Sequence, residues 1–100
     1  MKFMYEQPLQ EYMLKRGKKT IVVEEITSNN SDFEITELHI HLIDEKKTEY
    51  FKTKKSYYSV TTDMGFVLLP PFKLKYDDTV TFGLKSFLGI KYISCKGIHK

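Results

Sequence analysis

The last third of the chain holds the densest run of apolar residues, and its pattern predicts three short strands. Short apolar or alternating runs that are bounded by turn residues are typical of strands. The three strands are expected at Gly65–Leu69, Thr79–Leu84 and Ile90–Cys95. Breaks are expected at Pro70-Pro71 and at Asp77-Asp78, because both dipeptides are typical of turns.

The segment between the last two of these strands, Lys85–Gly89, is expected to be a connector or a short helical turn. We expect it to carry Phe87 and Leu88 inward. Phe82, Leu84 and Phe87 are then expected to be shielded from solvent inside a closed or nearly closed sheet.

Near the N-terminus the pattern predicts one short helix. Pro8 suits the first helical turn, since its missing N–H costs nothing there. Leu9, Tyr12 and Met13 follow at helical spacing, and Gly17 is a typical stop. A helix of about two turns is marginal on its own in water, so we expect its apolar face to lie across a sheet.

Three more strands are expected upstream of the last third. They are an edge strand at Lys2–Tyr5, a strand at Thr20–Ile26 and a long strand at Phe33–Ile43. The polar cluster Ser28–Asp32 is a turn between the last two. Within the long strand the apolar positions change from odd to even, which predicts a β-bulge near Thr36-Glu37.

The stretch that follows is polar and its pattern is ambiguous. Asp44–Lys47 is expected to be a turn. Thr48–Thr53 and Tyr57–Thr61 are expected to form either a polar hairpin around Lys54-Lys55 or one irregular excursion.

These elements fit one mainly β domain that spans residues 1–100. Tyr, Phe, Ile, Val and Thr are abundant and alanine is absent, which favours pleated, half-buried surfaces. Hydrophobic residues make up 41% of the chain, a folding rather than a disordered composition. We predict about seven strands with one short N-terminal helix, curled into a sandwich or partial barrel.

Charge and cysteine content limit which partners and which disulfides the chain can have. The net charge is +3 and both signs are interspersed, which permits a polyanionic partner without indicating one. Arg16 is the only arginine, whereas base and phosphate recognition favours arginine. One cysteine excludes an intramolecular disulfide. No signal pattern and no apolar run long enough to span a bilayer is present, so we expect a cytoplasmic protein without a membrane partner.

Two histidines on the long strand are a candidate metal site. His39 and His41 are two residues apart, so both point to one face, and Glu37 shares it. Two imidazoles and a carboxylate are plausible metal ligands. The alternative is a solvated outer face, opposite Leu38, Ile40 and Leu42, and the absence of a further ligand at a suitable spacing favours it.

Cys95 is the only candidate thiol. It lies in an alternating strand and shares parity with Lys91 and Ile93. Neighbouring lysines would activate it, but a cysteine in such a strand is more often an inert core residue. Asp77-Asp78 as an acidic pair for metal or acid–base chemistry is weighed against a hairpin turn, and the turn is favoured.

A mixed cationic and aromatic stretch is a candidate nucleic-acid surface. Single-strand binding grooves combine such charges with stacking platforms. The candidate residues are Lys52, Lys54, Lys55, Tyr57 and Tyr58. The alternative is a half-exposed hairpin whose aromatic side chains pack inward, and it is favoured. The sequence has no Gly-rich phosphate loop, no Gly-x-Ser-x-Gly and no CxxC.

The order of apolar segments in the last third resembles that of the HesB-like proteins of the CC/Se-motif family, remote relatives of the A-type iron–sulfur carriers. The resemblance rests on Gly65–Leu69, on Phe72-Lys73-Leu74, on Asp77-Asp78 and on the pattern from Val80 to Ile98. It implies a β-rich pseudo-barrel. The family's Cys-Cys or selenocysteine-Cys pair is replaced here by Ser28–Ser31, and only Cys95 is available near the C-terminus. No functional residue is therefore carried over, and no cofactor is expected.

The sequence leads to a non-enzymatic binding or scaffold module as the first hypothesis, with an unknown protein partner or a homo-oligomer. The alternatives are an iron–sulfur or metal-handling protein and a single-stranded nucleic-acid-binding module. An enzyme is the least expected class, because nothing in the sequence assembles a nucleophile with a base.

Overall fold

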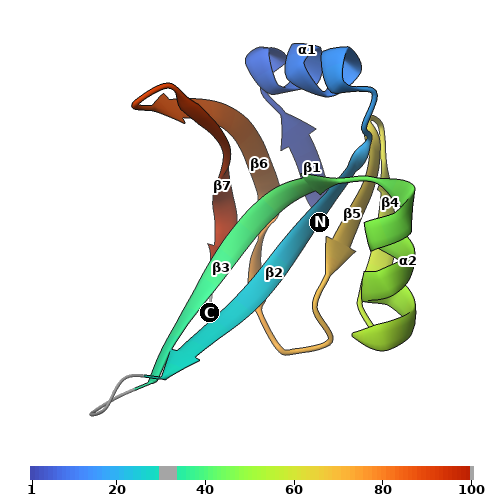
Figure 1. Cartoon of the computed structure of the whole chain (residues 1–100), viewed down its shortest axis with the longest axis vertical. Helices are drawn as coiled ribbons and strands as arrows, with labels where there is room; N and C mark the ends of the chain where they lie inside the picture. Colours follow the sequence, from blue (N-terminus) through green and yellow to red (C-terminus); the bar gives the residue numbers. More distant parts are fainter. Residues whose placement is uncertain (30–33, 100) are drawn as a thin grey trace.

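The computed structural model describes residues 1–29 and 34–99, and it confirms the mainly β fold (Figure 1). Within these residues seven strands form two sheets, and two helices accompany them. The strands are β1 Lys2–Tyr5, β2 Thr20–Asn29, β3 Glu34–Ile43, β4 Tyr58–Thr62, β5 Gly65–Leu69, β6 Lys75–Phe87 and β7 Ile90–His99. The helices are α1 Gln7–Arg16 and α2 Glu45–Lys54.

Each sheet joins segments that are far apart in the sequence. The three-stranded sheet has the order β1-β6-β7, so β1 is an edge strand as predicted. The four-stranded sheet has the order β3-β2-β5-β4. Two pairs, β1 with β6 and β2 with β5, are parallel, whereas the others are antiparallel. The connection through α1 carries the chain from the first sheet to the second, and the β5–β6 connection carries it back.

The helix α1 has the limits that its sequence predicts. Proline lies in its first turn, and Gly17 ends it in the left-handed conformation with φ 67°. Leu9 and Met13 are fully buried and Tyr12 is partly buried against the same cluster. The helix therefore covers one end of the space between the two sheets (Figure 1).

The main core lies between the two sheets and beneath α1. Phe82 is the largest fully buried side chain, and its ring is stacked on that of Phe3 at 5.9 Å between centroids. The buried members of this core come from both sheets and from the helix: Tyr5, Leu9, Met13, Ile21, Val23, Val67, Leu69, Val80, Phe82 and Ile93. One continuous core thus holds the sheets face to face.

A second helix, α2, replaces the hairpin or irregular excursion that the polar stretch was expected to form. Asp44 does not make a turn but caps the helix, since the N–H of Lys47 donates to its carboxylate at 2.9 Å. This bond lowers the pKa of Asp44. Phe51 is the buried side chain of the helix. It packs in a second cluster, on the outer face of the four-stranded sheet, with Val22, Ile43, Tyr57 and Leu68.

The predicted bulge in the long strand is absent. β3 pairs with β2 in one constant register, from Thr20 opposite Ile43 to Asn29 opposite Glu34. The outer parts of β2 and β3 extend beyond the core (Figure 1), so burial requires no bulge there. Ser28 and Asn29 continue β2 rather than start a turn, and the rest of the predicted polar turn lies outside the described residues.

The prediction of a turn at Asp77-Asp78 is also wrong, because both residues lie within β6. The pairing of β6 with β7 shifts register between Tyr76 and Thr81. A register irregularity therefore accommodates the two polar residues without ending the strand.

The two strands of the β6–β7 hairpin meet at a tip that is apolar and exposed. Phe87 and Leu88 were expected to turn inward, but 68% and 86% of their surface is exposed. Phe87 pairs with Ile90, so Leu88 and Gly89 form a two-residue turn with φ 50° and 81°. Such a tight turn extends β6 to its end and leaves no connector that could fold back onto the core.

The sheets do not close into a barrel. β3 and β7 are edge strands of different sheets, yet they lie alongside each other (Figure 1). Phe82 is buried and Leu84 is partly buried, as expected. The space between these two edge strands is where the candidate site lies.

Phe51→Ala should lower the free energy of unfolding by about 3 kcal/mol, because the substitution empties the centre of the cluster that attaches α2. Tyr50→Ala is the matched control, since the neighbouring ring is half exposed, and it should cost less than about 1 kcal/mol. Denaturant unfolding measures both. Equal losses in the two variants would show that α2 is not held through Phe51.

Candidate functional site

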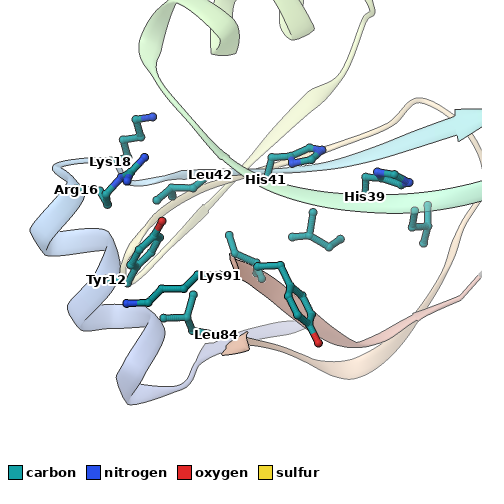
Figure 2. A pocket seen from close by; sticks show the side chains of 12 residues that line it. Tyr12, Arg16, Lys18, His39, His41, Leu42, Leu84 and Lys91 are labelled. Carbon is teal, nitrogen blue, oxygen red and sulfur yellow. The ribbon is translucent and has the colours of Figure 1, made fainter. Parts of the chain in front are cut away.

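A groove runs between β3 and β7 and ends at α1 (Figure 2). Its volume is about 620 Å³, within the range of ~300–1,000 Å³ that is usual for small-molecule sites. The lining residues are Tyr12, Arg16, Lys18, Leu38, His39, Ile40, His41, Leu42, Leu84, Lys91, Tyr92 and Ile93. None of them is acidic.

The floor of the groove is aliphatic. Alternate residues of β3, namely Leu38, Ile40 and Leu42, face the main core and are only partly buried. Leu84 of β6 and Ile93 of β7 lie directly opposite each other in the β6–β7 pairing. The buried Ile93 and four partly buried aliphatic side chains therefore line the space where the two sheets approach each other without pairing.

Two cations gather around one aromatic ring at the helical end of the groove. The guanidinium carbon of Arg16 and the ammonium nitrogen of Lys91 each lie 5.5 Å from the centre of the Tyr12 ring. Figure 2 shows these three side chains next to each other. A cation over an aromatic face is attracted by the ring, which holds both charges at the mouth of the groove.

These cations are not neutralised within the described part of the chain. The ion pairs found there, each with N and O within 4.0 Å, involve His39, His41, Lys55 and His99, but neither Arg16 nor Lys91. Lys18, the third cation of the lining, is close enough to Asp44 to contribute to the lowered pKa of that carboxyl. Arg16 and Lys91 are therefore the pair whose positive charge is open to a ligand.

The two histidines of the predicted metal site lie on the rim, on the face of β3 away from the main core (Figure 2). The Nε2 atom of His39 lies 3.1 Å from a carboxylate oxygen of Glu37. The Nε2 atom of His41 lies 3.8 Å from a carboxylate oxygen of Glu24. The imidazoles are 6.0 Å apart between ring centres. Residues 1–29 and 34–99 contain no group of three or more His, Cys, Asp or Glu that could hold a metal ion. Metal binding by Glu37, His39 and His41 stays a prediction.

Cys95 is not among the residues that line the groove and is partly buried against the main core. Burial raises the pKa of its thiol to about 11. The sulfur is therefore protonated at neutral pH, which disfavours a nucleophilic role. This environment matches an inert core cysteine.

The stretch proposed for nucleic acid is divided between two environments. Lys52 and Lys54 are exposed on α2, and Tyr58 is exposed on β4. Tyr57 is buried in the second cluster. Lys55 lies 3.6 Å from the carboxylate of Glu24 and above the Phe51 ring. The buried Tyr57 ring is therefore not free to stack on bases, whereas nucleic-acid binding by Lys52, Lys54, Lys55 and Tyr58 stays a prediction.

The sequence indicates His39 and His41 as site residues, and both line the groove, but it does not indicate the cationic end formed by Tyr12, Arg16 and Lys91. Tyr12 was assigned to the apolar face of the helix, and Arg16 was noted only as the single arginine. For Lys91 the sequence does contain a signal, because this residue lies on the same inward face of the strand as Ile93 and Cys95. A charged residue on the inward face of a strand needs a partner or an opening, and here it lies at an opening.

Comparison with protein-family models, with curated proteins and with solved structures finds no match for this chain.

Neither helix in the described part of the chain has the length and apolar character needed to cross a bilayer.

Cys95 should react with a soluble disulfide reagent on the order of a hundredfold more slowly in the native protein than in the unfolded chain. At about pH 8 a thiol with a pKa of about 11 is almost fully protonated, whereas an ordinary cysteine is partly ionised. Stopped-flow absorbance with and without denaturant measures the ratio. Similar rates in both states would contradict the buried, protonated thiol.

Proposed function

We propose that this protein is a non-enzymatic binding module that holds an anionic ligand with an apolar body in the groove between β3 and β7. The observation that carries the proposal is the lining itself. An aliphatic floor ends at Arg16 and Lys91, and no lining side chain is acidic.

The chemistry of the lining specifies both halves of such a ligand. The floor of Leu38, Ile40, Leu42, Leu84 and Ile93 gains free energy only from apolar surface that it removes from water. The two cations at the helical end favour a carboxylate, sulfonate or phosphate, because a hydrogen bond between an ionised donor and an anion is stronger than one between neutral groups. An apolar molecule without a charge would leave the cations unpaired, and a small anion would leave the floor open to water.

Binding is a better account of the groove than catalysis. Its lining holds the imidazoles of His39 and His41, but no Ser, Thr, Cys, Asp or Glu accompanies them there. Covalent catalysis by a hydroxyl or thiol requires a nucleophile within hydrogen-bond reach of its base. The carboxylates that contact these imidazoles, those of Glu37 and Glu24, are not among the lining residues.

We further propose a HesB-like relationship for the chain. What supports it is the order of elements: a strand, a helix that ends at Gly17, the strand pair β2–β3, and the unit formed by β5, β6 and β7. The binding role proposed above does not rest on this relationship, because none of the groove residues was carried over from it.

Anilinonaphthalene sulfonate, an anionic aromatic dye, should bind the native protein with enhanced fluorescence. Arg16→Ala and Lys91→Ala should each weaken the affinity about fivefold, because each removes about 1 kcal/mol of charge interaction at a partly exposed site. Binding should also weaken as salt is added. A fluorescence titration at two salt concentrations measures these effects.

Two control variants separate the groove from other surfaces. Lys52→Ala removes an exposed lysine on α2, outside the groove. Leu88→Asn removes the most exposed apolar side chain of the described residues, also outside the groove. Both should bind the dye as the wild type does. If the controls weaken binding as strongly as Arg16→Ala, the dye is bound elsewhere and the proposal is wrong.

A further inference from the structure

The β6–β7 hairpin ends in an apolar surface that lies outside the groove floor. This tip patch consists of Phe87, Leu88, Ile90 and Tyr92, with exposed fractions of 68%, 86%, 71% and 51%. Among the described residues Leu88 is the most exposed large apolar side chain. Phe87 and Ile90 face each other across the hairpin, so their side chains lie on one side of the sheet.

Local backbone preference does not explain the leucine in this turn. Leu88 has φ 50°, a left-handed conformation that asparagine and glycine adopt far more readily than leucine. Burial does not explain it either, because the side chain is exposed. A contact outside the chain accounts for an apolar residue that both local criteria disfavour.

The charge around the tip patch identifies the kind of surface that it would contact. From Thr79 to His99 the chain has no Asp or Glu, whereas it has Lys85, Lys91 and Lys96. Lys85 lies opposite Tyr92, and Lys91 directly follows Ile90. The end of the hairpin is therefore apolar, and lysines lie next to it in the sequence. This arrangement matches a surface with an apolar interior and an anionic boundary.

We propose that the tip patch inserts into the surface of a phospholipid bilayer that contains anionic lipids. Phe87, Leu88 and Ile90 would enter the boundary between headgroups and acyl chains, while Lys85 and Lys91 remain at the level of the headgroups. The expectation of no membrane partner rested on the lack of a spanning segment, which surface insertion does not require. A second copy of the chain is a poorer occupant, because two tips would bring like charges together. The proposal does not depend on a ligand in the groove.

Single-tryptophan variants give a direct test, since the chain has no tryptophan of its own. Phe87→Trp places the reporter in the tip patch. Phe72→Trp is the matched control, because Phe72 is also exposed but lies on the β5–β6 connection, at the opposite end of the molecule from the tip (Figure 1). Vesicles of phosphatidylcholine with a minor share of phosphatidylserine should shift the emission of Phe87→Trp to the blue. They should leave Phe72→Trp unchanged, and added salt should reduce the shift.

Leu88→Asn separates a loss of binding from a loss of fold. Asn-Gly is the favoured pair for this type of turn, so the midpoint of thermal unfolding should stay the same or rise. In co-sedimentation with the same vesicles, the partition coefficient should fall about tenfold or more, because the most exposed apolar side chain no longer enters the bilayer. A merely structural role of Leu88 would lower stability instead.

Several outcomes would overturn the proposal. One is an emission of Phe87→Trp that does not change with anionic vesicles, or changes equally with phosphatidylcholine alone. Another is co-sedimentation of the Leu88→Asn variant with the vesicles to the same extent as the wild type. A blue shift that grows with protein concentration in the absence of vesicles would assign the tip patch to a second copy of the chain.

Discussion

One packing constraint determines the rest of the structure: two sheets share a single apolar core, and their outer strands cannot also pair with each other. Sheets that pack face to face are ~10 Å apart, whereas paired strands are ~4.8 Å apart. Phe82 and the residues around it occupy the space between the sheets. β3 and β7 are therefore neighbours without a shared ladder, and a groove remains where a closed barrel would have a continuous wall.

The same constraint places charge where the groove ends. α1 covers one end of the core through Leu9 and Met13, which places Tyr12 beside Lys91 of β7. Arg16 and Lys91 meet there around the Tyr12 ring, although they are far apart in the sequence. Leu88 and Ile90, which lie between Lys91 and the end of the hairpin, are apolar and exposed. The groove and the tip patch thus share one region of the molecule, which carries positive charge beside open apolar surface.

The parts of the fold that the sequence predicts are those with local signals. Proline in the first turn and Gly17 at the end set the limits of α1, and apolar runs locate β2, β5 and the centres of β6 and β7. The helix α2 has a single buried residue, Phe51, so its sequence contains too few apolar residues to show a helical period. Asp44 was an available signal, because an aspartate before a polar run suits a helix cap as well as a turn.

The site could not be predicted in the same way, because the groove is a product of long-range contacts. Its lining combines side chains from α1, β3, β6 and β7, and no spacing in the sequence connects them. For the two histidines, in contrast, the sequence predicts the local arrangement but not a complete site. Their spacing places them correctly on one face of β3, but spacing alone does not supply the further ligands that a metal ion needs. Likewise, the aromatic residues at the hairpin tip look like core residues until the two-residue turn fixes them outside.

Residue-resolved amide hydrogen exchange tests the open edge between β3 and β7 most directly. In an edge strand every second N–H points away from the sheet and lacks a backbone partner. We expect protected and rapidly exchanging amides to alternate along the central parts of both strands, with the rapid ones directed toward the groove. Slow exchange at consecutive amides of both strands would show a continuous ladder between them and would contradict the groove.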